Sequence, residues 1–248
     1  QLIITTTPRP TQIISSLVRR KDKDVHLTSG NTFENHENLA ESALKQLEER
    51  YAGTRLGRQE LYAELLEDIE GALWSYRGLD DARIDKEDVP EYRRIVVAID
   101  PAVTNNEGSD ETGIIVAGTG IDGRYYVIDD VSGKMTPDGW GRTAIEMFYK
   151  YNADRIVAEV NNGGDLVERL LRNIDESVPY TPVRASRGKL VRAEPIAALY
   201  EQKKVSHIGV FKQLEEQLCS FSAGSNKSPD RLDALVWALT ELSQSSGT

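Results

Sequence analysis

Two short apolar runs in this 248-residue chain each end in a carboxylate. Asp100 follows the run at residues 95–99, and Glu159 follows the run at residues 156–158. Runs of this kind are typical of strands buried in a sheet. A carboxylate at the end of a buried strand is costly to desolvate unless it is paired or binds a metal. The chain is therefore predicted to fold around a sheet that carries acidic groups at its strand ends.

Each of these acids also has a simpler explanation. Aspartate is a common turn residue, and Asp100 precedes Pro101, so a turn-capping role explains it equally well. Glu159 also fits a solvated strand end. The segment that follows it, Asn161-Asn162-Gly163-Gly164, permits a tight turn and the close approach of a ligand. This turn favours a functional site next to Glu159.

A third acid lies on a helix that is predicted to begin near Ser228. Ser228 is a suitable N-cap, and Pro229 suits the first helical position. The apolar side chains that follow at helical spacing are Leu232, Leu235, Val236 and Leu239. Asp233 lies between members of this stripe, and Asp230 lies one turn earlier on the same side, so either acid could face the end of the sheet. Asp230 is also explained as an acid favoured by the helix dipole.

Asp110 is a candidate fourth acid. It precedes a strand predicted at residues 112–119. If this strand pairs antiparallel with the strand that ends at Asp100, its beginning lies near Asp100. A solvated position in a loop explains Asp110 equally well.

Carboxylates in such a set are suited to divalent cations. Mg²⁺ prefers carboxylate and water oxygens, and Mn²⁺ accepts the same ligands. Two such ions about 3.5–4 Å apart can activate a water and stabilise the leaving oxygen in phosphodiester hydrolysis. The three histidines and the single cysteine, Cys219, form no structural zinc pattern, so any metal is expected to have oxygen ligands.

The order of the predicted elements indicates an α/β fold. Strands at residues 95–100, 112–119 and 124–130 are expected to pair antiparallel, and helices and strands alternate after them. This order fits a ribonuclease-H-like domain, with a central mixed sheet flanked by helices. We place its beginning after Pro90. Residues 1–90 then form a mostly helical linker region, and residues 91–248 form the α/β domain.

Charge is distributed unevenly along the chain. The net charge of −10 argues against a protein that coats nucleic acid. Residues 183–212 nevertheless carry seven basic and two acidic residues, a local charge of +5. The basic side chains in the first part of this segment are Arg184, Arg187, Lys189 and Arg192. No apolar run is long enough to span a membrane.

Several segments resemble the large terminase subunit of tailed bacteriophages, the motor and nuclease that packages viral DNA. They follow the family's order and spacing, and the resemblance covers roughly residues 90–242. They are Val97-Ala98-Ile99-Asp100-Pro101-Ala102, Ser109-Asp110-Glu111-Thr112-Gly113-Ile114, Ala158-Glu159-Val160-Asn161-Asn162-Gly163-Gly164-Asp165, Gly188-Lys189-Leu190-Val191-Arg192-Ala193-Glu194-Pro195 and Ser228-Pro229-Asp230-Arg231-Leu232-Asp233-Ala234-Leu235.

The resemblance implies a metal-dependent endonuclease that cuts concatemeric viral duplex DNA during genome packaging, with two Mg²⁺ or Mn²⁺ ions. Asp100, Glu159 and Asp233 match the family's catalytic metal ligands. Asp110 matches an acid close to that site, and Asp230 is a further candidate ligand. The residues in the segment that is expected to contact DNA are Arg184, Arg187, Lys189 and Arg192.

The N-terminal segment adds to the resemblance. Ile4-Thr5-Thr6-Thr7-Pro8 looks like the family's coupling motif, on a late strand of its packaging ATPase, so residues 1–90 are expected to be the end of that ATPase and a linker. The sequence has no Gly-x-x-x-x-Gly-Lys-Ser/Thr phosphate loop, and nucleotide hydrolysis is not predicted. The family implies portal protein and small terminase subunit as partners besides DNA, and a phage-encoded protein of the host cytoplasm that is not secreted.

Two other functions are compatible with the sequence. One is a different ribonuclease-H-like nuclease, such as a junction resolvase or an enzyme that cuts RNA–DNA hybrids, which the Thr-Thr-Thr-Pro segment disfavours. The other is a non-catalytic module that docks on DNA or on a portal, which the presence of all three acids disfavours.

Overall fold

The computed structural model describes residues 3–6, 12–42, 44–45, 61–63, 71–102, 111–160, 164–222 and 229–244. The chain forms two compact units, Gln1–Asp68 and Ile69–Thr248. Within the described ranges, no helix is both long enough and apolar enough to cross a membrane.

The described part of the first unit includes the helix α1 (Gln12–Arg19) and the 3₁₀ helix η1 (Thr32–Asn38). An ion pair between Arg20 and Asp24 closes the turn after α1. Residues 3–6, which are part of the segment that resembles the coupling motif, form no strand, and Thr7 and Pro8 lie outside the described residues.

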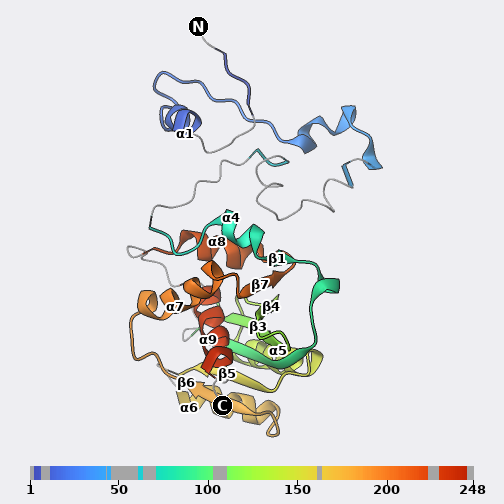
Figure 1. The fold of residues 1–248 in the computed structure, drawn as a ribbon, viewed down its shortest axis with the longest axis vertical. Helices are drawn as coiled ribbons and strands as arrows, with labels where there is room; N and C mark the ends of the chain where they lie inside the picture. The colour runs from blue at the N-terminus through green and yellow to red at the C-terminus, as the bar shows by residue number, and fades with distance from the viewer. Residues whose placement is uncertain are drawn as a thin grey trace. The chain divides into compact units, whose positions relative to one another are not determined.

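The second unit is built around a seven-stranded mixed sheet with the strand order β1-β7-β4-β3-β2-β5-β6 (Figure 1). As predicted, β2, β3 and β4 pair antiparallel in chain order. The other four strand pairs are parallel. The strands are β1 (Arg83–Ile84), β2 (Tyr92–Asp100), β3 (Gly113–Gly120), β4 (Tyr125–Asp130), β5 (Arg155–Glu159), β6 (Tyr180–Val183) and β7 (Val205–Ile208).

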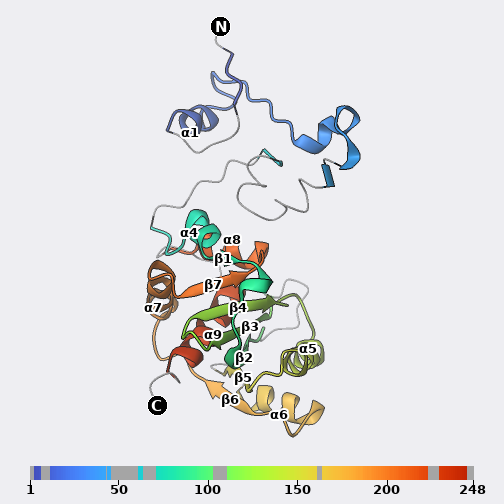
Figure 2. The same cartoon turned by 45° about the vertical axis from the view of Figure 1, so that its right-hand side comes forward.

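Helices cover both faces of this sheet, so the unit has two cores (Figure 2). Side chains alternate along each strand: Val96 and Ala98 pack in the core with α9, whereas Val97 and Ile99 pack in the core with α5. On the α9 face lie α4 (Tyr76–Asp81), α7 (Lys189–Glu201), α8 (Lys212–Ser220) and α9 (Asp230–Gln244). On the opposite face lie α5 (Pro137–Lys150) and α6 (Gly164–Ile174).

Local sequence explains where several helices begin. The hydroxyl of Thr136 accepts a hydrogen bond from the amide of Gly139 (3.2 Å), and Pro137 occupies the first turn of α5. Ser75 caps α4 in the same way, by accepting from the amide of Gly78 (3.1 Å).

The second unit begins earlier than residue 91, where we predict the start of the α/β domain. Trp74 and Leu79 are buried in the core on the α9 face, and β1 pairs with β7. A short 3₁₀ helix, η2 (Lys86–Asp88), joins β1 to β2. The elements β1, β7 and α8 are not predicted from the sequence. Strands of two and four residues with polar members such as Ser206 carry little periodic signal.

A buried polar network ties this early segment to β7 and α8. Arg83 donates to both carboxylate oxygens of Glu215 (2.9 and 3.1 Å) and to Asp80 (3.0 Å). Glu215 also lies 3.1 Å from Nδ1 of His207, whose Nε2 lies 2.8 Å from the hydroxyl of Tyr200. Burial alone raises the pKa of Glu215, but the hydrogen bonds with His207 and Arg83 outweigh burial and lower this pKa to about 2.

Glu215→Gln is expected to lower the free energy of unfolding by about 3 kcal/mol at pH 7, because it leaves the partly buried Arg83 without one of its carboxylate partners. The folded-state pKa of Glu215 lies below the ordinary value of 4.5. The stabilisation is therefore complete above the ordinary pKa and is lost as the pH falls toward the folded pKa. Urea denaturation at pH 7 and pH 3 measures it, and the difference between parent and variant should shrink at pH 3.

The exposed Asp138 offers a control, because its ion pair with Arg142 lies on the surface of α5. Asp138→Asn should change the free energy of unfolding by less than about 1 kcal/mol at either pH. An equal loss for Glu215→Gln at both pH values would contradict the electrostatic account of Glu215.

Candidate functional site

Asp100 and Glu159 end two adjacent parallel strands. The pairing of β2 with β5 runs up to Ile99 and Ala158, so the two acids are the next residues on neighbouring strands. Ala98 and Val157, two residues before the acids, point into the core with α9. Because side chains alternate along a strand, Asp100 and Glu159 point to this same face.

The first turn of α9 brings two further acids to this face. Asp230 is 8% exposed and Asp233 is 1% exposed. Gly113, at the beginning of β3, pairs with Asp100. A Cβ atom at Gly113 would lie 2.0 Å from the carbonyl oxygen of Asp230. The missing side chain at Gly113 therefore lets the beginning of α9 lie against β3, next to Asp100.

Two cationic side chains from the beginning of α7 contact these acids. Lys189 forms an ion pair with Asp233. The guanidinium group of Arg192 lies 3.3 Å from Oδ1 of Asp233 and 3.5 Å from Oε2 of Glu159. Oε2 of Glu159 also accepts a hydrogen bond from the indole N–H of Trp237 (2.7 Å). Arg192 stacks over the ring of Trp237, 4.7 Å from its centroid.

Burial and the negative charges of neighbouring carboxylates determine the pKa values of these acids. Burial raises the pKa of Asp100 to about 8, and the charges of Asp233 and Glu159 act in the same direction, against Lys189. Burial also raises the pKa of Asp233, against its hydrogen bond with Lys189 and the charge of Arg192. Buried acids with raised pKa values that gather at one place are typical of functional sites.

The charge balance of this cluster fits a divalent cation. If all four carboxylates, of Asp100, Glu159, Asp230 and Asp233, are ionised, they exceed the two cations by two negative charges, which a divalent cation would balance. In the part of the chain that the structure describes, no three Asp, Glu, His or Cys side chains form a ready-made metal site, and Lys189 and Arg192 lie against the carboxylates instead. Carboxylate oxygens and an excess of negative charge suit Mg²⁺ or Mn²⁺. Asp100, Glu159 and Asp233 would hold such an ion.

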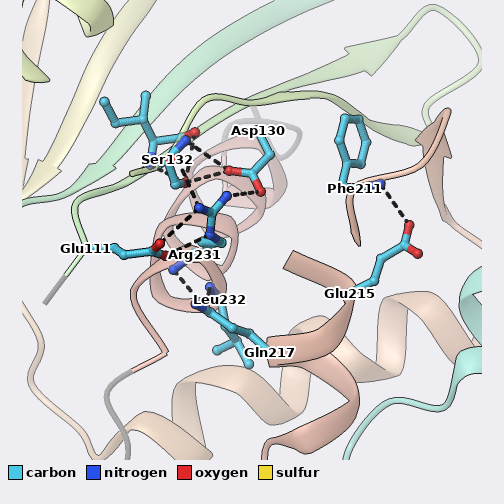
Figure 3. A network of polar contacts seen from close by, with 9 residues as sticks. Glu111, Asp130, Ser132, Phe211, Glu215, Gln217, Arg231 and Leu232 are labelled. Carbon is cyan, nitrogen blue, oxygen red and sulfur yellow. Dashed lines mark hydrogen bonds and ion pairs between the residues drawn. The ribbon is translucent and has the colours of Figure 1, made fainter. Parts of the chain in front are cut away.

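Arg231 anchors the beginning of α9 through its side chain (Figure 3). Its guanidinium group donates to Asp130 at the end of β4 (2.8 Å), to Glu111 just before β3 (2.9 and 3.3 Å) and to the carbonyl oxygen of Ser132 (3.0 Å). The side chains of Arg231 and Asp130 are each 4% exposed. A buried aspartate is stable only with such a partner, so these contacts hold β3, β4 and α9 together.

The backbone of the same helical turn is held from α8. The amides of Arg231 and Leu232 both donate to the side-chain oxygen of Gln217 (3.0 and 3.2 Å), as Figure 3 shows. These first-turn amides have no partner within the helix. Gln217 therefore fixes the turn that carries Asp230 and Asp233.

The structure thus brings Asp100, Glu159, Asp230 and Asp233 to one face, with Lys189 and Arg192 among them. Asp110 lies outside the described residues, and its place near Asp100 stays a prediction. Arg184 and Arg187 are exposed in the connection between β6 and α7.

Two residues that contact the acids or anchor their helix, Arg231 and Trp237, are not predicted from the sequence. A signal for Trp237 exists in the sequence, because residues four apart lie on one face of a helix and Trp237 follows Asp233 by four. No pattern in the sequence points to the partners of Arg231.

The mixed sheet, its two layers of helices and the acids at the strand ends define a ribonuclease-H-like domain, the fold class predicted from the sequence. The family described as "Terminase RNaseH-like domain" matches residues 97–242, more than half of the chain. The chain belongs to this family, which confirms the predicted resemblance to large terminase subunits.

Solved structures with the same fold come from bacterial viruses and from human cytomegalovirus. The large terminase nuclease from thermophilic phage G20c has 16% sequence identity and a TM-score of 0.51, over 69% of this chain and 98% of that chain. A manganese-soaked, inhibitor-bound terminase nuclease domain of human cytomegalovirus has 14% identity and a TM-score of 0.53, over 68% and 95%. The nuclease domain of the large terminase subunit of bacterial virus Sf6 has 13% identity and a TM-score of 0.53, over 68% and 98%. No curated protein matches the chain.

Arg231→Met is expected to lower the free energy of unfolding by about 3–5 kcal/mol, because it leaves the buried carboxylate of Asp130 without its cationic partner. Arg142→Met, which removes an exposed ion pair on α5, should cost less than about 1 kcal/mol. Urea denaturation of both variants and the parent measures these changes. Similar losses for the two variants would show that Arg231 does not anchor α9.

Proposed function

We propose that this domain is a divalent-metal-dependent endonuclease that cuts concatemeric viral duplex DNA during genome packaging. The observation that carries the proposal is the acidic cluster of Asp100, Glu159, Asp230 and Asp233, which two strands and one helix contribute to a terminase ribonuclease-H-like domain. The manganese-soaked terminase nuclease with the same fold supports the choice of metal.

In this proposal Asp100, Glu159 and Asp233 are the catalytic metal ligands, and Asp230 and Asp110 are further candidate ligands. Two Mg²⁺ or Mn²⁺ ions, when bound, would activate the attacking water and stabilise the leaving oxygen of the phosphodiester. The fold places the three proposed ligands: the ends of two strands hold Asp100 and Glu159, and the anchored first turn of α9 holds Asp233. Lys189 and Arg192 balance part of the charge of these acids.

Duplex DNA is proposed to reach the acids along the basic segment that leads into α7. Arg184 and Arg187 are exposed there, a few residues before Lys189 and Arg192, which contact the acids. Exposed arginines bind phosphates without reading the base sequence, so they would place the DNA backbone over the acidic cluster. Low sequence preference follows from this arrangement.

We further propose that the domain works as part of a DNA-packaging assembly. Residues 1–90 are proposed to be the end of a packaging ATPase and a linker. Portal protein and small terminase subunit are proposed as partners, in the cytoplasm of an infected host cell.

Plasmid cleavage tests the nuclease proposal. The parent chain is expected to nick and linearise supercoiled plasmid with Mg²⁺ or Mn²⁺ and not with EDTA. Asp100→Asn should slow cleavage by at least about 100-fold, since outer-shell partners of metal ligands alone contribute 10–100-fold. Asp138→Asn, an exposed acid on α5, should cut at the parental rate.

Cleavage by Asp100→Asn at the parental rate would make the site assignment wrong. Tight DNA binding without metal, and no product with any metal, would favour a docking module instead. Faster cleavage of a four-way junction or an RNA–DNA hybrid than of linear duplex would favour a different ribonuclease-H-like nuclease.

Salt dependence tests the DNA path. In an Asp100→Asn background, Arg184→Ala and Arg187→Ala should each weaken duplex binding uniformly across sequences and reduce the slope of log affinity against log salt by about 1. Arg142→Ala, on the opposite face of the sheet, should leave affinity and slope unchanged. Fluorescence anisotropy with labelled duplexes at several salt concentrations measures both. An unchanged slope for both arginine variants would contradict the proposed path.

A further inference from the structure

Trp237 lies one helical turn after Asp233 on α9, so both side chains leave the same face of the helix. Its indole N–H donates to Oε2 of Glu159 at 2.7 Å. Trp237 is 7% exposed, and the side chain of Glu159 is 14% exposed. A tryptophan on the helix therefore holds an acid of the neighbouring strand from inside the protein.

This donor has properties that suit the orientation of a metal ligand. A carboxylate at a strand end rotates about its side-chain torsions unless a partner fixes it. The indole N–H only donates, carries no charge and does not titrate. It therefore orients Glu159 at any pH and, unlike a lysine or arginine, brings no positive charge that would repel a cation. Hydrogen bonds to an ionised acceptor are also the stronger kind.

The same ring positions a second group. The guanidinium of Arg192 stacks on the Trp237 ring, 4.7 Å from its centroid, and reaches both Glu159 and Asp233. The placement of Arg192 against the two acids thus depends on the ring face, whereas the orientation of Glu159 depends on the ring N–H.

We propose that Trp237 is a positioning residue that orients Glu159 for binding a divalent cation. The inference rests on the proposed function, because it requires Glu159 to be a metal ligand. The contribution of Trp237 acts through one hydrogen bond, so it is separable from packing by substitutions that remove the N–H and keep a ring.

Isothermal titration with Mn²⁺ measures this contribution without any cleavage. Trp237→Phe keeps an aromatic face for Arg192 and removes the N–H, and it should raise the dissociation constant for Mn²⁺ by about 10-fold or more. Replacing Trp237 with β-(3-benzothienyl)alanine, which keeps the bicyclic ring without an N–H, should give the same loss. This second variant tests the bond even if the phenylalanine variant folds poorly.

Trp140 offers a matched control on the other face of the sheet. It is 3% exposed, and its N–H has no hydrogen-bond partner among the described residues. Trp140→Phe therefore makes the same change of ring in a buried place without removing a hydrogen bond. Its dissociation constant for Mn²⁺ should stay within about twofold of the parental value, well inside the loss expected for an outer-shell partner.

A double-mutant cycle separates positioning from packing. In a Glu159→Ala background, Trp237→Phe should cause no further loss of Mn²⁺ affinity, because the group that it positions is gone. Equal losses in the two backgrounds would show that Trp237 acts by packing alone.

The Mn²⁺ titrations distinguish a failure of the proposed function from a failure of the inference about Trp237. A parent chain that binds no Mn²⁺ overturns the proposed function, and the inference falls with it. A parent that binds Mn²⁺, with unchanged affinity in both Trp237 variants, overturns the inference and leaves the proposed function standing. A loss for Trp140→Phe as large as that for Trp237→Phe also overturns the inference.

Discussion

The burial of α9 against the centre of the sheet is the constraint on which the acidic cluster depends. Leu232, Leu235 and Leu239 are fully buried, so the helix lies deep in one core. The first turn of α9 is buried as well, although it contains the charged residues Asp230, Arg231 and Asp233. Charged groups at that depth require partners. Gly113 provides the space, Gln217 satisfies amides of the turn, and Asp130 and Glu111 neutralise Arg231.

Two arginines, one buried and one partly buried, join distant segments of this unit through ion pairs. Arg83 and Arg231 each lie between two carboxylates, and each joins segments that are distant in the chain: Arg83 holds the early β1 segment to α8, and Arg231 holds α9 to β3 and β4. Acids outnumber bases in both clusters by one, and part of that excess is exposed at Asp80 and Glu111. The cluster around Asp100 has four acids and two bases, and burial together with the neighbouring acids raises the pKa of Asp100 to about 8. This larger excess of acids supports the proposed binding of a divalent cation.

Much of this arrangement is predictable from the sequence. The apolar runs before Asp100 and Glu159 predict their strands. If the two strands are taken as parallel neighbours, the alternation of side chains also predicts that both acids lie on one face. The stripe around Asp233 predicts its helix. Contacts between residues far apart in the chain are not predictable in this way. They include the pairing of β7 with β1 and β4, the close approach of Gly113 to α9 and the hydrogen bonds of Arg231. Local patterns carry no information on such contacts.

The position of α9 in the chain has a consequence for the assembly of the acidic cluster. Strands β2, β3 and β4 follow one another, and neighbours in sequence meet at low entropic cost. α9 is the last described element, and without it Asp100 and Glu159 are carboxylates at the ends of a half-covered sheet. The cluster therefore exists only while α9 is docked, and local detachment of the helix would separate Asp230 and Asp233 from the two strand-end acids.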